Sequence, residues 1–251
     1  PAAPPCMRPC LFLLLAALTG VAVRPAALRV ASGPRRIALL ELYTSEGCSS
    51  CPPAERWLAT LQDDPGLWRA FVPVEFHVNY WDGLGWPDRF ATRAFTERQY
   101  ALAAGWGDPS VYTPCFVRNA VAWRIGSAAP ADDRPAGELT VEWDGRSCTA
   151  SFSSPAGAPP EAALEIHVAW LGGGLASRVT AGENRGTTLR HEFVALALSG
   201  HPLAAAGGGV WRAQFALPAP AAQDAPRRAL AAWVTRRGSL VPLQAAGGWA
   251  D

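Results

Sequence analysis

Apolar residues follow a strand–helix–strand order near the start of the chain. Residues 37–43 form an almost continuous apolar run, which predicts a strand that is buried on both faces. Residues 54–61 carry apolar side chains at i, i+3, i+4 and i+7, the spacing of one helix face. In residues 71–78, valine and phenylalanine alternate with other residues, which predicts a second strand.

The next segments add a helix and a hairpin. Residues 92–104 predict the helix, and glycines that follow it are typical of a helix end. Two short strands, residues 115–118 and 121–125, are separated only by Asn119 and Ala120. This spacing predicts a hairpin, although the favoured two-residue turn would have Gly in place of Ala120.

The pattern changes in the second half of the chain. Short β-rich segments follow one another at near-regular spacing between Gly, Pro, Asn and Asp, and none of them predicts a helix. They are residues 138–143, 147–153, 163–171, 175–181, 188–198, 210–217, 228–236 and 239–244. Residues 137–251 therefore predict an all-β antiparallel, sandwich-like domain, and residues 127–136, with two prolines, predict a linker.

A Cys-Ser-Ser-Cys-Pro-Pro run lies between the first predicted strand and the first predicted helix. Its thiols, Cys48 and Cys51, are spaced to close a small reversible disulfide, and they could also bind a soft metal. A C-x-x-C beside a β-α-β pattern is typical of a thioredoxin-like motif. The predicted fold is therefore an α/β thioredoxin-like domain, residues 34–126, followed by the all-β antiparallel sandwich-like domain.

This arrangement assigns candidate catalytic residues. Cys48, at the helix N-terminus, is the expected attacking thiolate, and Cys51 is the expected resolving thiol. We expect the Thr113–Pro114 peptide bond to be cis and to face the two sulfurs; the alternative is an ordinary trans turn. Glu41 interrupts the first strand and is either a buried general base or a solvent-facing residue at a strand edge.

Four polar or aromatic residues follow the second predicted strand at its carboxyl end, where α/β sheets bind ligands. They are His77, Tyr80, Trp81 and Asp82. Together with Thr113, they predict a wall of a substrate groove. Taken singly, each is better explained as a packing or hydrogen-bonding member of a rigid loop.

The start of the chain predicts an export signal, residues 1–27. Arg8 precedes an uncharged apolar stretch, residues 10–23, and small residues follow it. Met7 is the only methionine, so residues 1–6 are a possible upstream extension. We expect a periplasmic or secreted protein without a stable membrane span after processing; a retained N-terminal anchor is the alternative. The net charge of +1 provides no basic field for nucleic acid.

Several stretches together resemble a known family. They are ELYTSEGCSSCPPAE (41–55), FHVNYWDGLGWPDRF (76–90), FTERQYA (95–101), VYTP (111–114) and GENRGTTLRHEFV (182–194). They are similar to the exported, thioredoxin-like family known as domain of unknown function 1223. The resemblance implies a thioredoxin-like domain joined to a β domain, with no settled activity. Cys115 departs from the family pattern and is a possible third thiol near the pair.

The sequence supports one main hypothesis for function. It predicts an exported thiol–disulfide oxidoreductase that uses Cys48 and Cys51, acts on protein thiols or disulfides, and needs no cofactor or metal. Two alternatives remain: a non-enzymatic secreted binding protein with a structural C-x-x-C disulfide, and a copper- or zinc-binding module that uses the two thiols with His77.

Overall fold

The protein is mostly β in the residues that the computed structural model describes, which are 28–125, 132, 134–158, 163–220 and 225–250. In chain order the elements are β1 (Leu28–Ala31), β2 (Ala38–Thr44), α1 (Pro52–Thr60), the 3-10 helix η1 (Leu61–Asp63), β3 (Phe71–His77), the 3-10 helix η2 (Asn79–Leu84), α2 (Arg93–Gly105), β4 (Cys115–Arg118), β5 (Val121–Trp123), β6 (Glu138–Trp143), β7 (Ser147–Ser153), β8 (Leu164–Gly173), β9 (Leu175–Arg178), β10 (Thr188–His191), β11 (Val194–Gly207), β12 (Val210–Ala216), β13 (Arg227–Arg236) and β14 (Pro242–Trp249).

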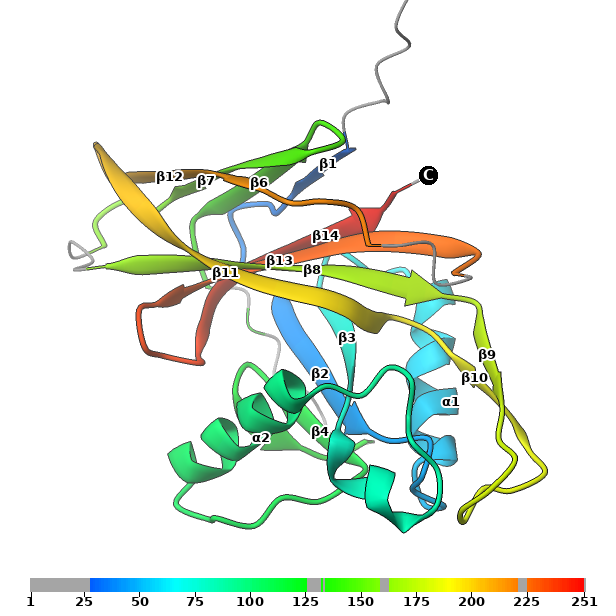
Figure 1. Cartoon of the computed structure of the whole chain (residues 1–251). Helices are drawn as coiled ribbons and strands as arrows, with labels where there is room; N and C mark the ends of the chain where they lie inside the picture. Colours follow the sequence, from blue (N-terminus) through cyan, green and yellow to red (C-terminus); the bar gives the residue numbers. More distant parts are fainter. Residues whose placement is uncertain (1–27, 126–131, 133, 159–162, 221–224, 251) are drawn as a thin grey trace, which may run out of the picture.

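Twelve of these strands belong to one mixed sheet. Its main path is β1-β6-β7-β12-β11-β3-β2-β4-β5, while β8, β13 and β14 join it through β11 (Figure 1). The long strand β11 connects the parts, because Val194 pairs in parallel with Glu75 of β3 and residues 204–207 pair with β12. Strands β9 and β10 form a separate hairpin.

The predicted fold class, an α/β thioredoxin-like domain followed by an all-β sandwich-like domain, is wrong. Strand β3 of the first predicted region and β11 of the second are hydrogen-bonded neighbours within one sheet, and β1, which precedes the first region, pairs with β6 of the second. The pattern of apolar residues showed where strands occur but not which strands pair across the sheet. The export signal predicted for residues 1–27 lies outside the described residues, and no described helix is long and apolar enough to span a membrane.

Most predicted elements are confirmed. The strands expected at 37–43 and 71–78 and the helix expected at 92–104 match β2, β3 and α2 within two residues. The expected hairpin is formed by β4 and β5, with Asn119 and Ala120 both at positive φ. One predicted segment, residues 188–198, contains the end of the β9–β10 hairpin and the start of β11 instead of one strand.

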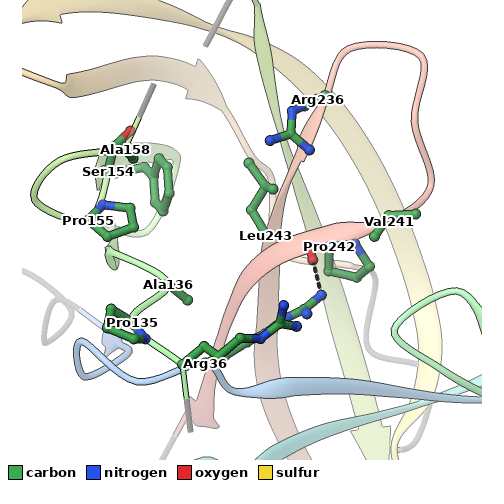
Figure 2. A pocket seen from close by; sticks show the side chains of 12 residues that line it. Arg36, Pro135, Ala136, Ser154, Pro155, Ala158, Arg236, Val241, Pro242 and Leu243 are labelled. Atoms are coloured by element: carbon green, nitrogen blue, oxygen red, sulfur yellow. Dashed lines mark hydrogen bonds between the residues drawn. The ribbon is translucent and has the colours of Figure 1, made fainter. Parts of the chain in front are cut away.

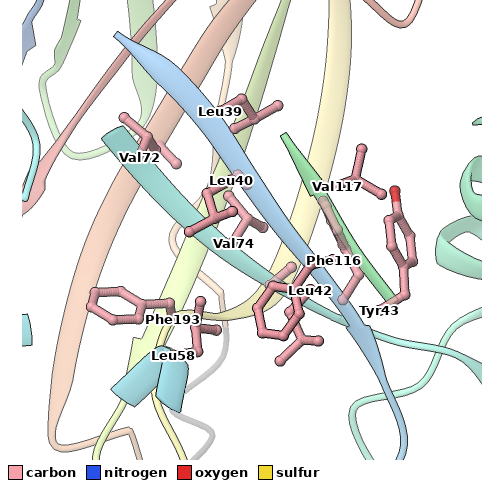
Figure 3. Packing of buried hydrophobic residues seen from close by; sticks show 14 of the residues in the cluster. Leu39, Leu40, Leu42, Tyr43, Leu58, Val72, Val74, Phe116, Val117 and Phe193 are labelled. Atoms are coloured by element: carbon pink, nitrogen blue, oxygen red, sulfur yellow. The ribbon is translucent and has the colours of Figure 1, made fainter. Parts of the chain in front are cut away.

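The core around β2 positions the elements of the site. All seven residues of β2 are buried, and this strand lies between the parallel β3 and the antiparallel β4. Figure 3 shows Leu42 of β2 near Leu58 of α1 and Phe193, which precedes β11. Burying a leucine side chain contributes roughly 1.5–3 kcal/mol. This packing holds α1 against the sheet beside β2.

Candidate functional site

Cys48 and Cys51 form a disulfide at the start of α1. Their Cα atoms are 5.4 Å apart, Cys51 is the N-cap residue of α1, and prolines occupy the first helical positions. Proline is tolerated there because the first helical N–H groups have no partner within the helix. The disulfide pair expected from the sequence is therefore confirmed. Both cysteines are 0% exposed, whereas Ser49 and Ser50 between them are exposed.

The loop between β9 and β10 covers the turn that contains the disulfide. The side chain of Asn184 donates hydrogen bonds to the carbonyl oxygens of Glu46 (2.9 Å) and Cys48 (3.0 Å). The Glu183 carboxylate accepts hydrogen bonds from the backbone N–H (3.1 Å) and hydroxyl (2.7 Å) of Ser49. The sequence indicated only turn residues here, so this contact between distant segments was missed.

A pocket of about 630 Å³ lies beside the disulfide turn. Its lining includes Ser50 and Pro53 from the start of α1 and Pro114 from the loop before β4. The lining is completed by Ala54, Tyr112, Phe116, Trp123, Arg124 and Ile125. The Thr113–Pro114 peptide bond is cis, as expected from the sequence. Pro114 and the disulfide turn thus border the same groove.

The other expected groove residues do not line this pocket. Trp81 donates from its indole nitrogen to the Thr113 hydroxyl (2.9 Å), and its Cβ lies next to Gly47. The Tyr80 hydroxyl donates to Gln99 on α2 (3.3 Å). Asp82 accepts from the backbone N–H of Asp88. These contacts hold η2 against the disulfide turn and the loop before β4, while a role in binding substrate stays a prediction.

Glu41 and Cys115 are both buried in the sheet. Glu41 is 2.7 Å from Nε of Arg98 on α2 and accepts a hydrogen bond from the Tyr43 hydroxyl (3.2 Å), so it does not point to solvent. Cys115 is a free thiol that pairs with Tyr43 in the β2–β4 register. Burial raises the pKa of the Cys115 thiol, so it is a poor nucleophile near neutral pH.

Two histidines and four carboxylates form a buried cluster near the disulfide turn. We call this the histidine–carboxylate cluster; its members are Glu46, Glu55, Glu75, His77, Asp88 and His191. The ring of His77 donates from Nδ1 to Asp88 (2.6 Å) and from Nε2 to Glu75 (2.9 Å). His77 is thus 0% exposed, and it does not face a groove.

His191 completes the cluster from the end of β10. Its Nδ1 lies 3.2 Å from Glu75 Oε1 and 3.6 Å from Glu55 Oε2, and its Nε2 lies 3.3 Å from Glu46 Oε1. The rings of His191 and His77 meet edge to face, with centroids 5.0 Å apart. Glu75, His77 and His191 each offer one atom of a group whose atoms all lie within 4.8 Å, close enough to share a metal ion.

The carboxylates shift the pKa values of their neighbours. Burial alone would lower the pKa of His191, but Glu46 and Glu75 raise it to about 9. Burial likewise opposes charge on His77, yet Asp88 and Glu75 hold its pKa well above the usual value. Burial, with the nearby charge of Glu75, raises the pKa of Glu55 to about 7. The cluster therefore contains one carboxylate, Glu55, that changes protonation near neutral pH.

One signal in the sequence could have indicated part of this cluster. Glu75 and His77 are two residues apart in a strand, so they share one face of an otherwise apolar segment. Polar residues on a buried face need partners. No spacing rule connects them with His191, because that residue comes from a distant hairpin.

A second pocket, of about 330 Å³, shares no lining residue with the groove at the disulfide. Figure 2 shows Arg36 in this pocket, where its guanidinium donates to the carbonyl oxygen of Pro242 and also pairs with Asp132 (2.9 Å). Because the charge of Arg36 is matched within the protein, we place the candidate site at the disulfide instead.

The fold and the site define a mainly β protein with a disulfide turn at a helix N-terminus and a buried histidine–carboxylate cluster beside it. The chain belongs to the family described as protein of unknown function (DUF1223), which matches residues 39–235. Comparison with curated protein sequences finds no match.

Two solved structures resemble the fold. Protein AGR_C_4864 from Agrobacterium tumefaciens has a TM-score of 0.56 and 21% identity, over 86% of this chain and 95% of that chain. HBP35 of Porphyromonas gingivalis has a TM-score of 0.58 and 16% identity, over 86% of this chain and 76% of that chain. At these identities the similarity shows a related fold and nothing about activity.

Proposed function

We propose that this protein exchanges disulfides with the thiols of other proteins through Cys48 and Cys51, after export to the periplasm or the cell exterior. The observation that carries the proposal is the position of the disulfide at the first turn of α1, beside the groove that Pro114 lines. The N-terminus of a helix favours negative charge, so it stabilises a cysteine thiolate there.

The exchange conserves two electrons. A thiolate of a substrate dithiol attacks the Cys48 sulfur, a mixed disulfide forms, and Cys51 leaves as a thiolate that then takes up a proton. The second substrate thiol attacks the mixed disulfide, which releases Cys48. The substrate leaves oxidised, and both cysteines are left as thiols. The reverse sequence reduces a substrate disulfide.

Full burial of the sulfurs makes the exchange depend on movement of the cover. Asn184 and Glu183 of the β9–β10 loop are hydrogen-bonded to the disulfide turn. A substrate therefore reaches Cys48 only after this loop separates from the turn. The exposed aromatic side chain of Tyr112 and the pocket wall formed by Phe116 and Trp123 then offer an apolar surface for a peptide.

Burial also favours a second candidate function, a binding protein in which Cys48–Cys51 is a structural disulfide. Equilibration with glutathione or dithiothreitol buffers separates the two functions. An exchanging disulfide is expected to have a reduction potential above about −300 mV, and a structural one below it. The Cys115→Ser variant serves as a control, since it removes a nearby thiol and should leave the potential unchanged. A potential below that limit would reject the exchange function.

A further inference from the structure

The two imidazoles of the histidine–carboxylate cluster are arranged alike. Each ring has one nitrogen beside an outer carboxylate: Asp88 for His77, and Glu46 for His191. Each ring directs its other nitrogen toward Glu75 Oε1, at 2.9 and 3.2 Å. In metal sites, a ligating histidine commonly uses its second nitrogen to bind a carboxylate, which fixes the orientation of the ring.

Several buried polar atoms of this cluster have no hydrogen-bond partner in the described part of the chain. His191 is 1% exposed, yet neither of its ring nitrogens has a partner in hydrogen-bonding geometry, although carboxylates lie near both. Buried Oε2 of Glu75 and Oε1 of Glu46 also have no donor. Buried polar atoms are nearly always paired, so the cluster lacks a component.

The balance of charge indicates that the component is a cation. The cluster has four carboxylates and two imidazoles, and no ion pair in the described residues connects these carboxylates to an arginine. With every group ionised, the buried cluster would carry a net charge of −2. An uncompensated buried charge is strongly destabilising.

We propose that Glu75, His77 and His191 bind a divalent transition-metal ion of the zinc type. Ligand bonds of 2.0–2.1 Å in a tetrahedral site place neighbouring ligand atoms about 3.4 Å apart, which is close to the separations around Glu75 Oε1. Oε1 of Glu55 accepts a hydrogen bond from Thr44 (2.6 Å), so its Oε2, which lies 3.6 Å from His191 Nδ1, is the oxygen that we assign to the fourth position.

The site is separate from the disulfide chemistry. The sulfurs of Cys48 and Cys51 are bonded to each other, so the ligands are nitrogen and oxygen atoms only. The proposal holds whether the disulfide exchanges or is structural. Metal binding displaces the proton shared by His77 and Glu75, so it should release protons into the buffer.

The test is a zinc titration of the full chain with the disulfide oxidised, after removal of metal by a chelator. We expect one zinc ion per chain, measured by calorimetry and by elemental analysis. The Glu75→Gln and His191→Gln variants should bind at least tenfold more weakly. The Asp88→Asn variant should lose roughly 10–100-fold, as outer-shell changes do. The His201→Gln variant, outside the cluster, is the matched control and should bind normally.

Cobalt provides a measurement that needs no variant. Co²⁺ bound to the wild-type protein should show the visible bands of a four-coordinate nitrogen and oxygen site, without a sulfur-to-metal charge-transfer band. Zinc should then displace the cobalt. Absence of stoichiometric binding, or a cobalt spectrum dominated by sulfur, would overturn the proposal. Unchanged affinity in both folded ligand variants would do the same.

Discussion

At the scale of single residues, the buried polar side chains of the sheet are held by specific partners. Glu41 is paired with Arg98, and the ring of His167 lies flat on Trp233 with its Nε2 3.0 Å from the Thr235 hydroxyl. Such groups contribute to stability only in the protonation state that their surroundings favour.

His167 should make the protein less stable in mild acid. Burial disfavours the imidazolium, and Arg98 and His201 add to this effect, so the pKa of His167 is lowered to about 4. An unfolded histidine titrates near ~6.5, so between these values the unfolded chain binds the extra proton and stability falls as the pH falls. Urea unfolding at about pH 7 and about pH 5 measures how much of the free energy of unfolding is lost on acidification. This loss should be smaller in His167→Gln than in the wild type by about 1–2 kcal/mol. Equal losses in the variant and the wild type would contradict this assignment.

At the scale of elements, the sequence predicted the strands better than their partners. The apolar pattern places β2 and β3 correctly, because burial on one or both faces determines that pattern. It missed the length of β11, since Gly200 and Pro202 interrupt the apolar residues. Proline is tolerated there because residues 199–203 pair only with β8, so the other side of the strand is an edge.

The candidate site was predictable only where it is local in sequence. The disulfide, the helix after it and the proline before β4 follow from short motifs. The cover of the disulfide and the histidine–carboxylate cluster depend on the β9–β10 hairpin, which packs against α1 and reaches the turn from the second half of the chain. No local pattern contains that contact.

The β9–β10 loop should control access to the disulfide. Asn184→Ala removes two hydrogen bonds to the turn, and Glu183→Ala removes two more. Each hydrogen bond of the buried Asn184 side chain contributes about 1 kcal/mol, so the turn of Asn184→Ala should open more readily and its disulfide should be reduced by dithiothreitol roughly tenfold faster or more. Glu183 is exposed, so Glu183→Ala should increase the rate of reduction by less. Release of the two thiols measures the rate. The Arg185→Ala variant changes an exposed residue of the same turn and serves as control. If all four proteins react at one rate, the loop does not limit access.

At the scale of the whole molecule, one sheet connects the start, middle and end of the chain. Strand β1 pairs with β6, β11 joins β3 to β12, and β13 pairs with both β8 and β14. Apolar clusters lie on both sides of this connection, one around β2 and another around β7 and β8. A structure with shared strands and adjoining cores is expected to unfold as a unit, in contrast to two domains on a linker.

Gln244 of β14 provides the sharpest test of whether the molecule unfolds as one unit. Its buried side chain accepts from the Ile37 N–H (2.8 Å) and donates to the carbonyl oxygens of Gly33 (3.2 Å), Arg35 (3.0 Å) and Gly137 (2.8 Å). Gln244→Ala leaves the buried N–H of Ile37 and the buried carbonyl oxygen of Gly137 without this partner, so we expect a loss of about 2–4 kcal/mol in the free energy of unfolding.

The loss should appear as a single shifted transition. Tryptophan fluorescence and far-ultraviolet circular dichroism should give the same midpoint in the wild type and in Gln244→Ala, because coincident transitions indicate two-state unfolding. Gln214→Ala, at an exposed position of β12, is the matched control and should change stability by less than about 0.5 kcal/mol. Separate midpoints for the two probes in the wild type would contradict this expectation. They would indicate that the regions joined by β11 unfold in two independent steps.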